Sequence, residues 1–205
     1  MPVHPVPTPA TGPGHARVLP LVRAALAGHA GTGPVVVGID GRSGAGKTDL
    51  AAELVTALRT ETGLADDGVV LFALEDVYRG WNGLAVGLGA VAAGLLEPLS
   101  RGLTGRLRRY DWHAGEVDGL VEVPPPGAPL PRVLVLEGCG AGSAICAPFV
   151  DVLVWLDAPA DVRRRRAMER DEGSWTQMWD VWAEQESALL TARDARAAAD
   201  LIIRT

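Results

Sequence analysis

Short runs of consecutive apolar residues recur along the chain and are separated by longer stretches in which apolar residues return every three or four positions. A short continuous apolar run predicts a strand that is buried on both faces of a sheet. Five such strands are expected, at residues 35–39, 69–74, 133–136, 150–156 and 201–203.

The stretches between these runs have the spacing of amphipathic helices. Leu50, Leu54 and Leu58 recur every four residues after the first run, which places them on one helical face. Strands that alternate with helices indicate an α/β fold with a doubly wound, five-stranded parallel sheet, in which ligands bind at the carboxyl ends of the strands. Helices are expected at about residues 18–27, 49–60, 83–100, 161–170 and 175–192.

Two segments lack either pattern. Residues 1–14 are rich in proline, and we expect them to form a disordered tail. They contain no basic segment followed by an apolar core, so they do not resemble a secretory signal. The proline-rich residues 124–131 predict a loop before the third strand. Residues 15–205 are expected to form one domain with a single substantial core.

The segment that follows the first predicted strand, residues 41–48 (GRSGAGKT), has the spacing G-x-x-x-x-G-K-[ST] of a phosphate-binding P-loop. Its glycines let backbone N–H groups point at phosphate oxygens. Lys47, the only lysine in the chain, would neutralise the β- and γ-phosphates of ATP, and Thr48 would offer a hydroxyl to Mg²⁺. The motif predicts these nucleotide-binding residues: Gly41, Ser43, Gly44, Ala45, Gly46, Lys47, Thr48 and Asp49.

Acidic residues follow the second and third predicted strands. Glu137 comes after four aliphatic residues, as a Walker B carboxylate does, and we expect it to hold Mg²⁺ together with Thr48. Asp76 follows the second strand and is expected to be the general base that deprotonates an acceptor hydroxyl. Asp111 is the next candidate for this base.

Arginines dominate the fourth predicted helix. Arg163, Arg166 and Arg170 are three and four residues apart, so they share one side of a helix. Three guanidinium groups on one face would clamp triphosphate oxygens and stabilise the charge that develops in phosphoryl transfer. We therefore expect Arg163 to bind nucleotide, and Arg166 and Arg170 to be catalytic. An ordinary solvated face is the alternative explanation.

Cations and aromatic side chains lie side by side in residues 106–113 (RLRRYDWH). Such a mixture can stack a base and hold a polar ligand, although a surface loop with two anchoring aromatics would look the same. Tryptophans at helical spacing between residues 175 and 182 are expected in the core. The candidate acceptor-binding residues are Tyr78, Arg79, Arg109, Tyr110, Asp111 and Trp112.

The composition of the chain indicates which classes of binding partner to expect. A net charge of −6 argues against a broad nucleic-acid surface, and no apolar run is long enough to span a bilayer. Cys139 and Cys146 lack metal-binding spacing and are expected to be reduced thiols in a cytoplasmic protein. We expect ATP and a small-molecule acceptor as partners, with neither nucleic acid nor membrane. A homo-oligomer remains compatible with the sequence.

With these residues the chain resembles the uridine kinase-like branch of the P-loop kinases, including its actinobacterial members, from about residue 35 to residue 171. The matching motifs are the P-loop, Asp76-Val77-Tyr78, the pair Tyr110-Asp111, and the arginine-rich segment that ends at Arg170-Asp171. The resemblance implies ATP-dependent phosphoryl transfer, Asp76 as the base, an acceptor segment at about 76–118 and an arginine-rich lid at about 163–174.

The chain departs from that family at several positions. Val77 stands where the family has an aromatic residue, and Ala167 stands in place of an arginine. Residues 81–84 and 112–113 do not match the nucleoside-contacting pattern of the family.

The leading hypothesis is a Mg²⁺- and ATP-dependent kinase that phosphorylates a small molecule, with a nucleoside such as uridine as one candidate. One alternative is a nucleoside monophosphate kinase, in which Arg106, Arg108 and Arg109 hold the phosphate of the substrate. Another is a regulatory P-loop module without an acceptor. A second carboxylate directed at an acceptor would distinguish an enzyme from a regulatory module, because a switch does not need one.

Overall fold

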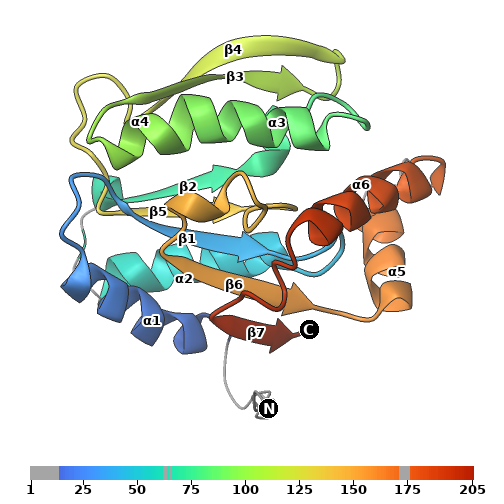
Figure 1. Cartoon of the computed structure of the whole chain (residues 1–205), viewed down its shortest axis with the longest axis horizontal. Coiled ribbons are helices and arrows are strands. Elements are labelled where there is room, and N and C mark those ends of the chain that lie inside the picture. The colour runs from blue at the N-terminus through green and yellow to red at the C-terminus, as the bar shows by residue number, and fades with distance from the viewer. Residues whose placement is uncertain (1–13, 62–63, 65, 171–175) are drawn as a thin grey trace.

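A computed structural model of the protein describes residues 14–61, 64, 66–170 and 176–205 (Figure 1). The predicted tail therefore lies outside the described residues except for Gly14, which is the first residue of helix α1 (Gly14–Gly28). Of the predicted lid, residues 171–174 also lie outside them.

A parallel five-stranded sheet forms the centre of the fold, in the order β2-β5-β1-β6-β7. Every residue of β1 and β5 is buried, as the continuous apolar runs predicted. The five predicted strands are confirmed, with ends that differ by one or two residues. Their bounds are β1 (Val35–Asp40), β2 (Val69–Ala73), β5 (Val133–Glu137), β6 (Val152–Asp157) and β7 (Leu201–Arg204).

Helices cover both faces of the sheet, and neighbouring residues of a strand face opposite layers. Val35, Val37 and Ile39 pack with α1 and with α2 (Lys47–Glu61), which lie on one side of the sheet in Figure 1. Val36 points to the other side. There it meets α3 (Leu84–Val91), a π-helical turn (Ala92–Leu96) and α4 (Glu97–Ser100). The helix predicted at 83–100 is thus one nearly continuous run.

Two further helices lie beyond the carboxyl ends of the strands, toward which the arrowheads point in Figure 1. They are α5 (Ala160–Arg170) and α6 (Trp179–Ala192). Short 3₁₀ helices lie at Asp66–Gly68, Leu74–Val77 and Ala147–Phe149. No helix of the described ranges is long and apolar enough to cross a bilayer.

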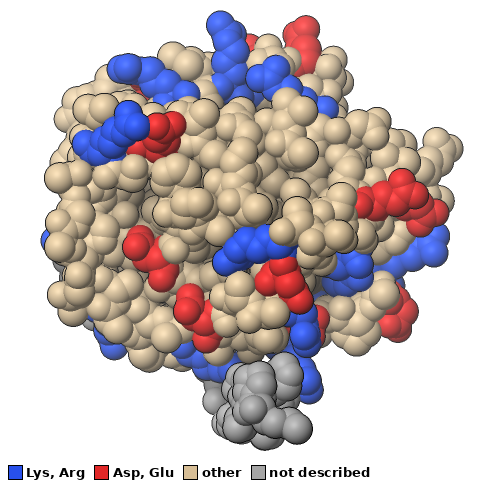
Figure 2. Space-filling model, in the orientation of Figure 1, with Lys and Arg blue, Asp and Glu red and all other residues tan. Residues whose placement is uncertain are grey.

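An antiparallel ribbon, β3 (Gly105–Asp111) and β4 (Glu116–Val123), was not expected. It packs on the layer formed by α3 and α4 (Figure 1). Leu107 and Val123 are buried in that layer, whereas Arg106 pairs with Glu122 on the outer surface. The strand was not recognised in the sequence because β3 has apolar side chains only at Leu107 and Tyr110, and a register shift between Arg108 and Arg109 interrupts the alternation. On the face shown in Figure 2, basic and acidic side chains are interspersed.

Candidate active site

The P-loop connects β1 to the first turn of α2, so its backbone N–H groups gather at a helix N-terminus. Gly44 and Gly46 have φ values of 80° and 88°, which side-chain-bearing residues rarely adopt. A Cβ atom on Gly44 would also lie 2.2 Å from the backbone oxygen of Arg163. Glycine adopts these φ values readily, and α5 packs directly against the loop.

A buried carboxylate joins the start of the P-loop to the loop that follows β5. Asp40 accepts hydrogen bonds from the backbone N–H groups of Gly41, Gly140 and Gly142, at 2.7, 2.9 and 2.8 Å. Burial raises the pKa of Asp40 above its ordinary value, although these three hydrogen bonds act in the opposite direction. Asp40 therefore holds two loops together and is not exposed to a ligand.

Lys47 lies in a pocket of acceptors at the base of the P-loop. Its Nζ atom donates to the backbone oxygen of Arg42 at 3.3 Å and to Sγ of Cys139 at 3.4 Å. Burial alone would lower the pKa of Lys47, but the thiol of Cys139 and three surrounding carboxylates raise it above its ordinary value. The lysine is thus a fixed positive charge.

Thr48 and Glu137 form the part of the site that suits a metal ion. Thr48 Oγ1 donates to Glu137 Oε1 at 3.4 Å, which brings a hydroxyl and a carboxylate from two predicted metal-binding positions together. Oxygen ligands of this kind fit Mg²⁺, which is usually held by one or two carboxylates and by substrate phosphates. Among the residues that the structure describes, no three His, Cys, Asp or Glu side chains cluster as a metal site.

A cleft of about 540 Å³ extends from the P-loop to a wall of aromatic side chains. Trp81 packs edge-to-face against Trp112 and Trp182, with ring centroids 5.3 and 6.2 Å apart. Tyr78 contacts Trp182 in the same manner at 5.2 Å. The cleft is lined by Ser43, Gly44, Lys47, Thr48, Glu75, Tyr78, Trp81, Trp112, His113, Glu137, Gly138, Cys139 and Trp182.

Hydrogen bonds fix the aromatic wall in place. Tyr78 OH donates to the backbone oxygen of Cys139 at 2.8 Å, and Trp112 Nε1 donates to that of Glu75 at 2.9 Å. Gln185 Nε2 of α6 donates to the backbone oxygen of Trp81 at 2.6 Å. Burial raises the pKa of Tyr78 well above its ordinary value, so its hydroxyl stays neutral.

The predicted general base lies beside the cleft rather than on its lining. Asp76 is ion-paired with Arg109 at 3.2 Å, and both side chains are about half exposed. The preceding residue, Glu75, lines the cleft. Both carboxylates lie in the 3₁₀ helix Leu74–Val77, which turns successive side chains in different directions. Asp76 was predicted as the base because it matches the general base of the uridine kinase-like family, but the pair Glu75-Asp76 does not by itself reveal which carboxylate faces the cleft.

Only some of the other residues predicted to bind the acceptor line the cleft. Tyr78 and Trp112 line the cleft, and Tyr110 packs edge-to-face on Trp112 at 5.4 Å. Asp111 accepts the N–H groups of His113 and Ala114 in its own turn, and these hydrogen bonds lower its pKa. Arg79 is exposed and does not line the cleft.

Six lining residues were missed as site residues: Glu75, Trp81, His113, Gly138, Cys139 and Trp182. Trp182 was expected in the core, and it is both a core residue and part of the cleft wall. Cys139 and Cys146 are free thiols, as expected. Burial raises the pKa of Cys139 to about 12, so the thiol is protonated at neutral pH.

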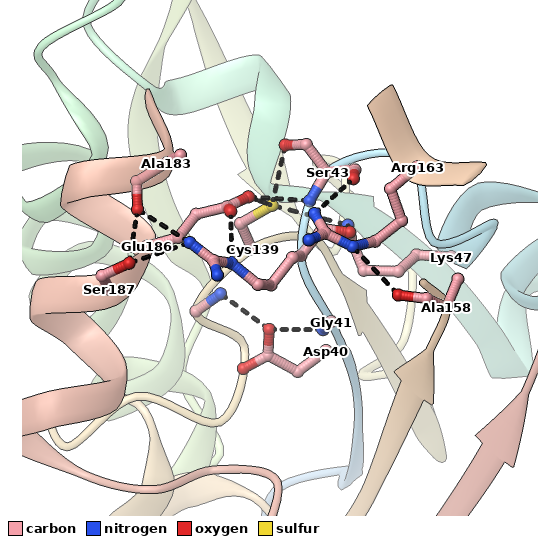
Figure 3. Close-up of polar contacts among 12 residues, drawn as sticks. Asp40, Gly41, Ser43, Lys47, Cys139, Ala158, Arg163, Ala183, Glu186 and Ser187 are labelled. Atoms are coloured by element: carbon pink, nitrogen blue, oxygen red, sulfur yellow. Dashed lines mark hydrogen bonds and ion pairs between the residues drawn. The ribbon is translucent and has the colours of Figure 1, made fainter. Parts of the chain in front are cut away.

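The arginines of the predicted clamp do not form one group, because Arg163 and Arg166 have different contacts. Arg163 is buried, and its Nη1 atom donates to the backbone oxygen of Ser43 at 3.2 Å (Figure 3). Arg166 is exposed, and its Nη1 atom donates to Thr205 Oγ1 at 3.3 Å. It lines a second cleft of about 400 Å³ together with Gly46 and Asp49. The side chain of Arg170 lies outside the described residues.

Comparisons with known proteins place this geometry in context. No family model and no curated protein matches the sequence. A solved structure of a possible uridine kinase from Bacillus stearothermophilus is 24% identical, with a TM-score of 0.63 over 92% of this chain and 97% of the other. A candidate fructose transport system kinase from Silicibacter sp. TM1040 is 20% identical, with a TM-score of 0.61 over 94% and 100%.

A third solved structure extends the likeness to a further kinase. D-glycerate 3-kinase from Cryptococcus neoformans is 16% identical, with a TM-score of 0.55 over 87% of each chain. These structures bear out the predicted architecture over nearly the whole chain, although their sequences are distant. The chain has the α/β fold of the P-loop kinases.

Proposed function

We propose that this protein transfers the γ-phosphoryl group of Mg²⁺-bound ATP to a hydroxyl of a small molecule held in the aromatic cleft. One observation carries the proposal: a single cleft is lined by Lys47, by the Thr48–Glu137 pair, and by the aromatic wall with the carboxylate of Glu75 beside it. A phosphate donor and an acceptor could therefore meet without intervening water. The solved structures with this fold are named as kinases, which supports the same class of reaction.

The two clefts suggest how ATP would lie across the loop. The acceptor cleft is lined by Gly44 and Lys47, whereas the second cleft is lined by Gly46 and Asp49 of the same segment. Phosphates bound along the loop would leave the nucleoside in the second cleft. There the guanidinium of Arg166 could stack on the base, a role that differs from the clamp expected from helical spacing.

The residues of the acceptor cleft supply the steps of the transfer. Lys47 holds the β- and γ-phosphates, and Mg²⁺ held by Thr48 and Glu137 would neutralise their charge. Glu75 is the carboxylate on the cleft wall, so we assign to it the removal of the proton from the acceptor hydroxyl. Asp76 and Asp111 remain the alternative bases.

The acceptor wall favours an uncharged substrate. Among the described lining residues, Lys47 is the only lysine or arginine, and it belongs to the P-loop. Arg106, Arg108 and Arg109, which could hold the phosphate of a nucleoside monophosphate, do not line this cleft, and Arg106 and Arg109 pair with Glu122 and Asp76. Indole faces stack well on a nucleoside base or a sugar ring. We therefore favour a nucleoside or sugar acceptor over a phosphorylated one, and a kinase over a regulatory module that lacks an acceptor cleft.

Two matched variants test this assignment. ADP release would be measured with nucleosides, nucleoside monophosphates and sugars for the wild type, Glu75→Gln and Asp76→Asn. We expect Glu75→Gln to lower turnover by about 10²–10⁴-fold, the usual contribution of a general base, with little change in ATP affinity. Asp76→Asn should keep most of its activity. The reverse ranking would return the base to Asp76, and wild-type protein that phosphorylates none of these compounds would contradict the proposed function.

A further inference from the structure

A carboxylate of α6 lies against the P-loop, although no motif predicted it. Glu186 is only 4% exposed. Its Oε1 atom accepts the backbone N–H of Ser43 at 2.7 Å and the S–H of Cys139 at 3.3 Å. Its Oε2 atom accepts the Nε–H of Arg42 at 2.9 Å. One side chain of α6 thus contacts two consecutive residues of the P-loop.

Arg42 adds a second set of contacts to the same helix. Its Nη2 atom donates to the backbone oxygen of Ala183 and to Ser187 Oγ, both at 2.8 Å. From the opposite side, Arg163 of α5 donates to the backbone oxygen of Ser43. The backbone of Ser43 is therefore held between α6, which accepts its N–H, and α5, which donates to its carbonyl oxygen, and its position depends on both helices.

The charge of Glu186 is stabilised in place. Burial by itself would raise the pKa of this carboxyl group, but the Ser43 N–H, Lys47 and Arg42 together lower it below its ordinary value. Glu186 is therefore an anion at neutral pH. Without it, the Ser43 N–H and the Arg42 guanidinium would lose a buried charged partner, which costs more than the hydrogen bonds gain when formed.

The same helix also builds the acceptor wall. Trp182 lies one helical turn before Glu186 and lines the acceptor cleft. Gln185, next to Glu186, holds the backbone of Trp81 and accepts the N–H of Leu84 at 3.3 Å. Consecutive side chains of α6 thus contact the phosphate-binding loop and the aromatic wall.

We propose that Glu186 is a positioning residue, which acts through Arg42 and Ser43 to set the distance between the P-loop and the acceptor wall carried by α6. This inference rests on the proposed phosphoryl transfer. In this proposal Glu186 does not contact the substrate; it holds the P-loop and the acceptor wall at a fixed distance from each other. Because misplacement of reacting groups by about 1 Å can lower a rate by about 10²-fold, its loss should affect turnover more than nucleotide binding.

The matched variants are Glu186→Gln, which keeps an acceptor for Ser43 but loses the charge, and Glu184→Gln on the exposed side of the same helix. For Glu186→Gln we expect kcat to fall at least about tenfold, while the Kd of Mg·ATP measured by calorimetry changes less than about threefold. Glu184→Gln should match the wild type. Equal loss of kcat and ATP affinity in Glu186→Gln, or no loss at all, would overturn the proposal.

Hydrogen exchange gives a readout that does not depend on turnover. In Glu186→Gln the amide exchange should increase in two separate segments, residues 41–48 and residues 78–84, and stay unchanged in the buried strand β5. An increase confined to α6 would contradict the linkage. If the linkage is observed but the wild type phosphorylates no acceptor, the proposed function fails and the structural coupling of loop and wall stands.

Discussion

At the scale of single residues, Lys47 is a buried cation at the base of the P-loop. The sequence uses arginine at every other basic position, and the structure shows why this position differs. Lys47 Nζ fits between the backbone oxygen of Arg42 and Sγ of Cys139, a space for a compact ammonium group. A planar guanidinium needs more room and presents its donors in a fork.

Replacement of Lys47 should therefore separate charge from shape. We expect Lys47→Ala to lower kcat/KM by roughly 10- to 150-fold, because a hydrogen bond to a charged group contributes about 1.5–3 kcal/mol. Lys47→Arg should also be poor in spite of its charge. Steady-state kinetics would measure the effect, and thermal unfolding would check that both variants fold. Full activity in Lys47→Ala would mean that the loop does not bind the transferred phosphate.

At the scale of secondary structure elements, α5 places two arginines in different surroundings, although helical spacing had assigned them to one clamp. Arg163 and Arg166 are three residues apart, yet Arg163 is buried against the P-loop and Arg166 borders the second cleft. Side chains three residues apart point in similar but not identical directions around a helix. Because α5 packs beside the loop, this difference is enough to give the two arginines different neighbours. Sequence spacing predicts which side chains share a face of a helix, but the packing of the helix against other elements determines what those side chains contact.

The two arginines should consequently respond differently to removal. Arg163→Ala should lower thermal stability, because the buried guanidinium donates to Ser43 and to Ala158. Arg166→Ala should leave stability nearly unchanged and weaken ATP binding. Melting curves and ATP titrations would be compared with the exposed control Arg164→Ala. Identical behaviour of all three variants would show that α5 is only a solvated helix.

At the scale of the whole molecule, buried carboxylates tie distant parts of the chain to the P-loop. Asp40 joins the loop to the segment after β5, and Glu186 joins it to α6. The contact of Ser43 with Glu186 spans 143 residues. Stability of the fold and geometry of the site therefore depend on the same two carboxyl groups.

This dependence predicts an effect of pH. The pKa of Glu186 is lower in the folded protein than its ordinary value of 4.5. As the pH falls, Glu186 therefore binds a proton in the unfolded chain before it does so in the folded protein. The contribution of Glu186 to the free energy of unfolding is complete above pH 4.5 and is lost as the pH falls through the pKa of the folded protein. We expect the melting temperature of the wild type to fall more steeply below about pH 4.5 than that of Glu186→Gln. Parallel curves would show that Glu186 carries no such contribution.

The sequence by itself determined the sheet, the helices beside it and the P-loop. Each of these follows from a pattern within a few neighbouring residues: the apolar run of Val35 to Ile39, the spacing of Leu50, Leu54 and Leu58, and the glycines before Lys47. Local patterns of this kind predict structure because burial of the strand and the turn of the loop leave few alternatives.

Only the tertiary structure decided which polar groups meet. It turned Glu75 rather than Asp76 into the cleft, paired β3 with β4, and brought Glu186 to Ser43. These outcomes depend on the rotation of a short helix and on packing between segments that are far apart along the chain. Neither leaves a signal in neighbouring residues, because contacts across the molecule are set by how whole elements pack together.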